Sequence, residues 1–233
     1  GRCYAQKNDY NSASRILKQS LMQGCNEAAF LLAELMFDQK VKYRPAELMG
    51  FYERAAVGGI PEAIKKYAYI LYYGTITGHP DKKKSLQFIQ MGSDQGDPEL
   101  MHQWAVRLEF GRGVEKDVKQ AMELIKLSAD KGYGPAMVDY GIHLLNGINI
   151  EPNENEAKAC FRSAASQKEP WGQLWYYIMC KERELDDTIN YKELNEYLTQ
   201  SLQTNQVPES WAVYGKAIAD EGNIDDALTS LFY

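Results

Sequence analysis

One pattern recurs six times along this 233-residue chain and constrains its fold more than any other feature. A pair of residues with small or short side chains recurs at intervals of 35, 37, 36, 36 and 37 residues. A second pair, in which a mostly large residue precedes a mostly small one, recurs at intervals of 35, 37, 36, 36 and 38 residues. A period between about 20 and 50 residues is typical of solenoids and other repeat arrays. The first pairs are Ser20-Leu21, Ala55-Ala56, Gly92-Ser93, Ser128-Ala129, Ala164-Ala165 and Ser201-Leu202; the second are Leu32-Ala33, Tyr67-Ala68, Trp104-Ala105, Tyr140-Gly141, Tyr176-Tyr177 and Tyr214-Gly215.

Between these marks the spacing of apolar residues predicts helices. Leu100, Trp104 and Leu108 follow one another at the four-residue spacing of a helix face. Glycine followed by proline separates one repeat from the next, as in 59–61 and 96–98, where glycine suits a helix end and proline the first turn of the next helix. Each repeat is therefore predicted to be an antiparallel helix pair. One pair cannot bury its apolar stripe alone, so neighbouring pairs must stack into an all-α solenoid.

The repeat from Pro98 to Tyr133 resembles a Sel1-like repeat, a relative of the tetratricopeptide repeat. Its loop at 110–117, with Ala121 and the segment 128–132, follows the family pattern of glycine, glycine-valine, aspartate, alanine, alanine-alanine and glycine. The resemblance extends over essentially the whole chain, with degenerate loops at 38–45 and 74–81. It implies a right-handed superhelical solenoid of about six repeats of 35–38 residues.

Both ends of the sequence fall inside a repeat. Gly1 occupies the position that Gly141 and Gly215 hold later, and 224–233 resembles the start of a second helix. Because each repeat of a solenoid contacts its neighbours, no internal domain boundary is needed. We expect residues 1–233 to be one solenoid domain that begins and ends within a repeat, and to be a fragment of a longer protein.

Composition excludes several classes of function. A net charge of −6, from 26 basic and 32 acidic residues, provides no basic field for nucleic acid. No apolar run approaches the roughly 18 residues of a membrane span, so no membrane insertion is expected. The four cysteines occupy unrelated positions in the repeats, unlike the disulfide in every repeat of some secreted members of the family. This favours a reduced, cytoplasmic setting.

Two patterns that could indicate chemistry have simpler explanations. Ser128 and Lys131 match a serine-x-x-lysine signature, but its companion motifs are absent and Ser128 occupies a packing position that alanine fills in other repeats. The three histidines, His79, His102 and His143, have no other histidine or cysteine at metal-ligand spacing. We therefore expect no catalytic residues, no metal and no cofactor.

The resemblance to tetratricopeptide superhelices places a concave surface along the first helix of each pair. The inward positions are those just after the small residue and one turn further on. Aromatic residues there are common binding anchors, and carboxylates at Glu34, Glu62, Glu99 and Glu109 would attract basic partner residues, although a glutamate in a first turn also complements the helix dipole. The candidate contacts are Glu34, Phe37, Tyr69, Tyr72, Tyr73, His102, Glu109 and Phe110.

These observations favour a scaffold or adaptor that binds a partner peptide or helix in its concave groove, as the family resemblance implies. Two alternatives remain open. The array could be the regulatory arm of an enzyme whose catalytic domain lies outside this sequence. It could also be mainly structural and self-associate through an exposed terminal repeat, because the ends lack the polar caps that solenoids need.

Overall fold

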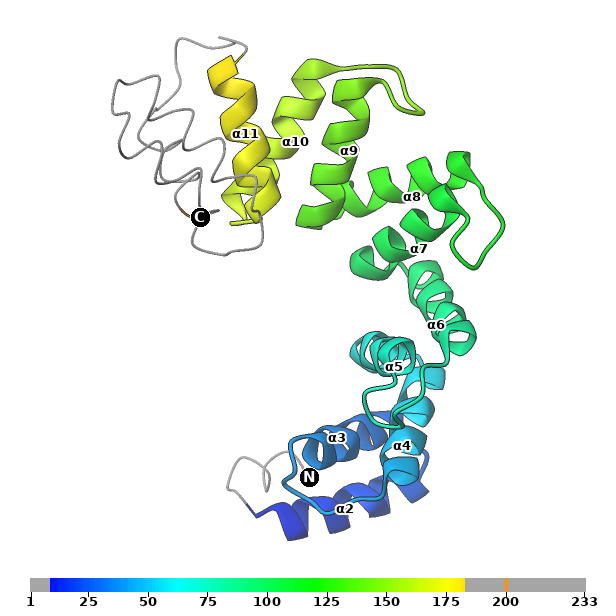
Figure 1. Ribbon diagram of the computed structural model, residues 1–233. Helices are drawn as coiled ribbons and strands as arrows, with labels where there is room; N and C mark the ends of the chain where they lie inside the picture. The colour runs from blue at the N-terminus through cyan, green and yellow to red at the C-terminus, as the bar shows by residue number, and fades with distance from the viewer. Residues whose placement is uncertain (1–8, 183–199, 201–233) are drawn as a thin grey trace. The chain divides into compact units, whose positions relative to one another are not determined.

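The computed structural model describes residues 9–182 and residue 200, and this part of the chain is entirely α-helical (Figure 1). The most extensive helix contacts are between neighbours in the chain, as predicted for stacked pairs. The helices are α2 (Tyr10–Met22), α3 (Asn26–Phe37), α4 (Pro45–Val57), α5 (Pro61–Tyr73), α6 (Lys82–Asp94), α7 (Pro98–Phe110), α8 (Val118–Asp130), α9 (Gly134–Asn146), α10 (Glu154–Ser166) and α11 (Pro170–Glu182).

The predicted helix pairs are confirmed. The odd-numbered helices are the first helices of the repeats and the even-numbered ones the second helices. The loops predicted at 38–45, 74–81 and 110–117 lie between α3 and α4, α5 and α6, and α7 and α8. The marks at 201–202 and 214–215, and both ends of the chain, lie outside the described residues.

The helices group into two compact units. Unit 1 contains α2 to α6, the start of α7 as far as Trp104, and residues 113–115 of the following loop. Unit 2 contains the rest of α7 and α8 to α11. Within unit 2 the first helices α9 and α11 also touch each other, so a surface is shared between successive repeats.

The small pair that marks each repeat accepts two hydrogen bonds at the end of a second helix. After α8, the amide of Tyr133 donates to the carbonyl of Ser128 (3.2 Å), and that of Gly132 to the carbonyl of Ala129 (2.8 Å). These are the two bonds of a Schellman motif, whose turn residue adopts positive φ. The same pair of bonds recurs after α2, α4, α6 and α10. The turn residues are Gly24, Gly59, Gly96, Gly132 and, in the last turn, Lys168.

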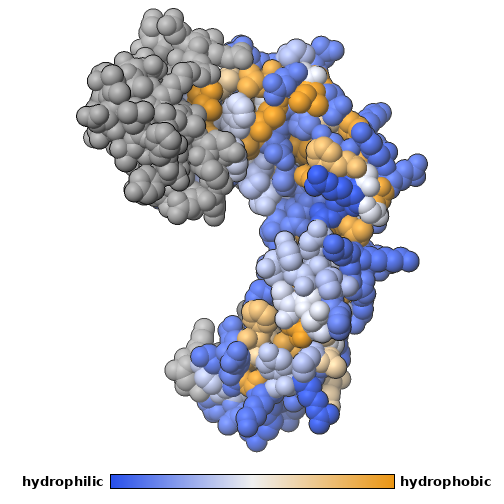
Figure 2. All heavy atoms as spheres, viewed as in Figure 1, coloured by the Kyte–Doolittle hydropathy of each residue, from blue (hydrophilic) through white to orange (hydrophobic). Residues whose placement is uncertain are grey.

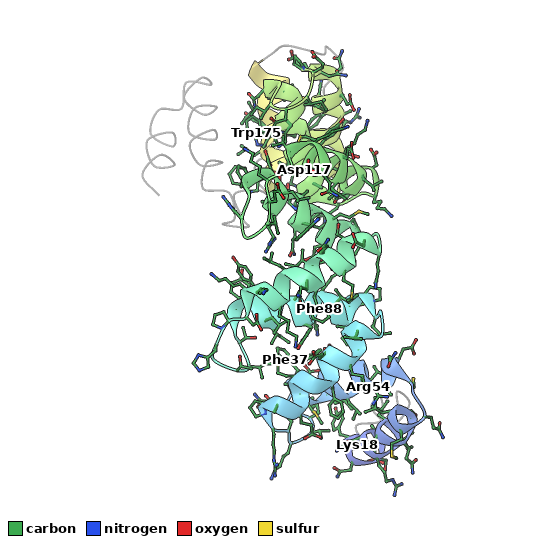
Figure 3. The ribbon with its side chains drawn as sticks, turned by 90° about the vertical axis from the view of Figure 1, so that its right-hand side faces the viewer. Lys18, Phe37, Arg54, Phe88, Asp117 and Trp175 are labelled. Carbon is green, nitrogen blue, oxygen red and sulfur yellow. The ribbon has the colours of Figure 1, made fainter. Side chains whose placement is uncertain are left out.

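The aspartate of the family loop begins the second helix. The Asp117 carboxylate accepts the amide hydrogen of Gln120 (2.9 Å) and so caps α8; Asp117 is labelled in Figure 3. A cap of this kind satisfies one of the free amide groups at a helix start and stabilises a helix by about 1 kcal/mol. Asp9, Asp81 and Asn153 cap α2, α6 and α10 in the same way, whereas Arg44 precedes Pro45 at the start of α4 and makes no side-chain cap.

The second position of the large-then-small pairs lies where two helices approach closely. Gly141 on α9 is buried, and a Cβ atom added there would lie 2.6 Å from the ring of Phe161 on α10. Ala68 and Ala105 occupy the same position in α5 and α7 and are also buried. In α9 a small residue is needed here because α10 places the Phe161 ring directly against the backbone.

Candidate interaction surface

Three tyrosines of α5 form one exposed cluster in unit 1. The core face of this helix is filled by Tyr67, Ala68, Ile70 and Leu71, so the remaining tyrosines lie on other faces. Tyr69 and Tyr73 are one turn apart, are 59% and 58% exposed, and have ring centroids 4.6 Å apart. Tyr72 lies edge-on to Tyr73 at 4.9 Å, and Lys82 Nζ lies 5.5 Å from the Tyr72 ring centroid.

Phe37 and Glu34 lie in a second cluster, at the end of α3. Phe37, labelled in Figure 3, is 47% exposed and meets Tyr52 edge-on at 6.4 Å. The Tyr52 hydroxyl donates to Glu34 Oε1 (2.8 Å), and Lys66 forms an ion pair with the other oxygen of Glu34. Burial, together with the hydrogen bond to Glu34, raises the pKa of Tyr52. The carboxylate of Glu34 is thus already engaged by two donors of the chain.

Lys66 on α5 is a neighbour of residues in both clusters of unit 1. It lies 5.7 Å from the ring centroid of Phe37, and Tyr69 follows Lys66 by three residues on α5. Residues three apart on a helix are neighbours on its surface. The predicted contacts Glu34, Phe37 and Tyr69 therefore lie along one stretch of surface.

The predicted contacts on α7 have different environments. Phe110 is exposed at the C-terminus of the helix, and its ring centroid lies 4.7 Å from the guanidinium of Arg112. His102 is half-buried. Glu109 is only 9% exposed, because its carboxylate lies against the imidazole of His143 on α9. Of the carboxylates expected to attract a basic partner, Glu109 is thus withdrawn from solvent.

The other two carboxylates predicted to attract a basic partner, Glu99 and Glu62, also differ in their surroundings. Glu99 lies 3.5 Å from the ammonium of Lys65, which forms a closer ion pair, 2.9 Å, with Asp97. Glu62 is exposed in the first turn of α5. Ser128, the residue of the serine-x-x-lysine pattern, is fully buried at the packing position that the sequence assigned to it.

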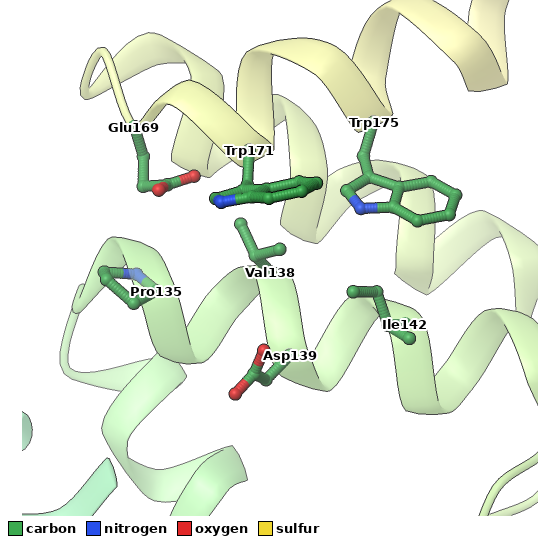
Figure 4. Close-up of a pocket in the computed structure, with 7 residues that line it drawn as sticks. All are labelled: Pro135, Val138, Asp139, Ile142, Glu169, Trp171 and Trp175. Carbon is green, nitrogen blue, oxygen red and sulfur yellow. The ribbon is translucent and has the colours of Figure 1, made fainter. Parts of the chain in front are cut away.

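A pocket in unit 2 was not predicted from the sequence. It lies between α9 and α11 and has a volume of about 280 Å³. Figure 4 shows Val138 pointing toward Trp171, and Ile142 toward Trp175. The residues that line it are Pro135, Val138, Asp139, Ile142, Glu169, Trp171 and Trp175.

The position of these residues in the repeat explains why they were missed. Trp175 and Asp139 both stand two residues before the small-residue position, whereas the predicted surface begins just after it. Only Ile142 belongs to the inward positions on which the prediction was based. Two tryptophans one turn apart on a first helix were the available signal, but an aromatic pair at helical spacing more often fills a core.

Two contacts hold the walls of the pocket in place. The Trp175 ring stacks on Phe161 at 5.6 Å with an interplanar angle of 16°, and Phe161 is fully buried. The Glu169 carboxylate accepts the amide hydrogen of Gly172 (2.5 Å) and caps α11. Burial raises the pKa of Glu169, although the amides of Gly172 and Trp171 act in the opposite direction; the charge of Asp139 raises it further.

The surface around these sites is mixed. Figure 2 shows hydrophobic residues on the visible face as separate patches among hydrophilic ones. Over the described residues, none of the helices has the length and apolarity needed to cross a bilayer. In the same part of the chain, histidine, cysteine and carboxylate side chains do not gather in groups of three or more that could hold a metal ion.

Comparisons with known proteins agree with this architecture. The family model described as the Sel1 repeat matches residues 61–97, 98–133 and 134–169, which correspond to α5–α6, α7–α8 and α9–α10 with their following turns. None of the curated proteins compared with the sequence matches it.

Two solved structures are similar over nearly the whole chain. One is a protective antigen of uropathogenic Escherichia coli strains with an SLR fold, at 19% identity and a TM-score of 0.76. The match covers 93% of this chain and 47% of the antigen, so this chain spans about half the length of that protein. The other is a Sel1 repeat protein from Oxalobacter formigenes, at 16% identity and a TM-score of 0.72, with 96% of each chain covered. Residues 61–169 are thus three consecutive Sel1 repeats, and the described chain shares the solenoid fold of these two proteins.

Proposed function

We propose that this chain is a scaffold that holds a partner protein, through an extended peptide or a helix, against the exposed side chains of its first helices. Sel1 repeats generally serve in protein–protein interaction, which supports the class of function. The observation that carries the proposal is the cluster of Tyr69, Tyr72 and Tyr73, because two of its rings are more than half exposed while they contact each other.

The arrangement of these rings favours binding. A tyrosine contributes a large apolar area and a hydroxyl while losing little side-chain entropy, and aromatic residues are enriched among the residues that dominate binding energy. Contact between Tyr69, Tyr72 and Tyr73 restricts their rotamers before a partner arrives, which lowers the cost of association. Phe37 extends the apolar area of unit 1 from the end of α3, and unit 2 separately exposes the ring of Phe110 at the end of α7.

The carboxylates have a different role in this proposal. Glu34 and Glu99 form ion pairs with Lys66 and Lys65, and Glu109 lies against His143. They fix the positions of neighbouring side chains, while the net charge of −6 over the whole chain favours the approach of a basic partner. In this proposal the aromatic residues, not the carboxylates, make the apolar contacts that bury the side chains of the partner.

The test is an affinity capture with this chain as bait, comparing the parent with a Tyr69→Ala, Tyr72→Ala, Tyr73→Ala triple variant. Partners that bind the parent are expected to be lost with the triple variant. A Tyr43→Ala, Val57→Ala double variant is the matched control, because it removes exposed apolar side chains outside the cluster and should retain the partners.

Thermal unfolding of each variant checks that binding is compared between folded proteins, which requires cooperative melting of all three. Partners retained by the triple variant at the level of the parent would contradict the assignment of the tyrosine cluster. Equal loss of partners with the control variant would also contradict it, because the effect would then follow from general loss of apolar surface.

A further inference from the structure

We propose that the pocket between α9 and α11 binds an arginine side chain of the partner, with its guanidinium against the tryptophan rings and its charge balanced by Asp139 and Glu169. The inference rests on the proposed function, because it names the chemistry of a side chain that the partner presents. It uses only residues of unit 2, so it can fail or succeed independently of the tyrosine cluster in unit 1.

The walls of the pocket suit a long side chain. Pro135, Val138 and Ile142 on α9 present apolar surface opposite Trp171 and Trp175 on α11 (Figure 4). A pocket of about 280 Å³ that is open to solvent can admit the methylene stem of an arginine between these walls. Burial of such a stem against apolar surface is favourable while the charged end remains at the polar edge.

The aromatic rings suit a planar cation. One face of Trp175 is occupied by Phe161, so the indole is held in place and the pocket receives the remaining surface of the ring. Trp171 lies one turn earlier on α11, beside Glu169 (Figure 4). Tryptophan is the best aromatic partner for a cation. A guanidinium stacks on such rings and is more weakly hydrated than an ammonium, which favours arginine over lysine.

The charges of the pocket select a cation. Both ionisable residues that line it, Asp139 and Glu169, are carboxylates. Glu169 is partly desolvated and is repelled by the charge of Asp139, as the raised pKa of Glu169 reflects. A guanidinium placed at this edge relieves the repulsion and donates in a fork to carboxylate oxygens. An anionic side chain would increase the same repulsion and is excluded.

The indole resonances of Trp171 and Trp175 provide a direct readout. The probe is N-acetyl-arginine amide, titrated into the 15N-labelled chain while the indole N–H signals are followed by NMR. Signals are assigned with Trp171→Phe and Trp175→Phe variants. The neutral isostere N-acetyl-citrulline amide is the matched probe, since it has the same shape without the charge.

The expected result is a saturable shift of both indole signals with the arginine probe and at least about fivefold weaker binding of the citrulline probe, from the loss of a cation–π and an ion-pair interaction. The indole of Trp104, which is buried and does not line the pocket, should not move. Equal affinity for both probes, or no shift at Trp171 and Trp175, would overturn the inference.

Variants of Glu169 and Asp139 test whether the negative charge of the pocket, rather than its shape, contributes to binding of the arginine probe. Glu169→Gln keeps an oxygen that can accept the Gly172 amide hydrogen, so the cap of α11 is preserved while the charge is removed. It should weaken the arginine probe by about three- to tenfold, as should Asp139→Asn. Glu151→Gln removes an exposed charge of the same unit outside the pocket and should leave binding unchanged. Equal affinity of the Glu169→Gln, Asp139→Asn and parent proteins would overturn the role of the carboxylates.

Failure of this inference can be told apart from failure of the scaffold proposal. If the arginine probe binds the pocket but no partner is captured through the tyrosine cluster, only the scaffold proposal is contradicted. If partners depend on the tyrosine cluster but the arginine and citrulline probes behave alike, only the present inference is contradicted.

Discussion

The Nε2 atom of His143 on α9 lies 3.5 Å from Oε1 of Glu109 on α7, and both residues are buried in unit 2. The other ring nitrogen, Nδ1, lies 3.0 Å from the carbonyl oxygen of Ile148. A carbonyl can only accept, so Nδ1 carries a proton and donates it there. His143 therefore connects α7, α9 and the loop that follows α9.

Replacing His143 by alanine is expected to lower the free energy of unfolding by about 1–3 kcal/mol, because the Ile148 carbonyl loses its donor and the buried imidazole leaves a gap beside Glu109. Urea unfolding followed by circular dichroism measures the change. His79→Ala, in the exposed loop between α5 and α6, is the control and should change stability by less than about 0.5 kcal/mol. Similar effects of the two substitutions would show that the His143 contacts contribute nothing specific.

Substitution by alanine is expected to change the stability of the protein in opposite directions at Gly141 and at Gly50. At Gly141 a new Cβ would lie 2.6 Å from the rigid, buried ring of Phe161, so Gly141→Ala should destabilise the protein by about 1–3 kcal/mol. At Gly50, on the exposed side of α4, a Cβ meets nothing within 4 Å. Gly50→Ala should stabilise by about 0.5–1 kcal/mol through helix propensity alone. Differential scanning calorimetry of the two variants tests the pair, and stabilisation by Gly141→Ala would contradict the packing argument.

Lys168 is the one non-glycine turn residue among the five Schellman turns that end the second helices α2, α4, α6, α8 and α10, with φ of 63°. A left-handed conformation is unfavourable for a residue with a Cβ, so Lys168→Gly is expected to stabilise by about 0.5–1 kcal/mol. The reciprocal control is Gly132→Ala at φ 88°, where the added Cβ has ordinary space but the conformation is strained. That variant should lose about 1 kcal/mol in chemical unfolding. A destabilising Lys168→Gly would mean that the lysine side chain contributes more than the strain costs.

Alkaline pH is expected to weaken the fold partly through Tyr140. Burial, followed by the charge of Glu156, raises the pKa of Tyr140 from 10.0 to about 12. A raised folded pKa means that stability is fully present below the unfolded value near 10 and is lost as pH rises toward 12, because the unfolded tyrosine releases its proton first.

The measurement compares unfolding free energies of the parent and Tyr140→Phe at about pH 8 and about pH 11. The variant cannot ionise at this position, so it should lose less stability between the two pH values than the parent. Parallel losses in both proteins would show that Tyr140 does not contribute to the alkaline transition.

The sequence predicted the helix pairs because the features that determine them are local. The small pair such as Ser128-Ala129 supplies the acceptors of the turn that ends each second helix, and an aspartate such as Asp117 supplies the cap that begins it. Both depend on residues within six positions of each other. The resemblance to Sel1-like repeats rests on the same residues, and the three matched repeats contain them.

The candidate surface was predicted less completely. The sequence placed Tyr69 and Tyr73 on a binding face, and their exposure in unit 1 is consistent with that assignment, which stays a prediction until binding is measured. The sequence also placed Glu109 on this binding face, although its carboxylate is buried against His143, 34 positions later in the chain. It did not anticipate the pocket of Trp171 and Trp175.

The sequence by itself thus determined the repeat, the helix pairs and the turns between them, because hydrogen bonds between near neighbours fix them. Tertiary structure alone decided which aromatic and charged side chains remain accessible. A helix has several faces, and how much of each is covered depends on side chains from other helices, as Phe161 of α10 shows by stacking on Trp175 of α11. Such contacts join residues whose spacing along the chain carries no local signal, so they become visible only when the helices have packed.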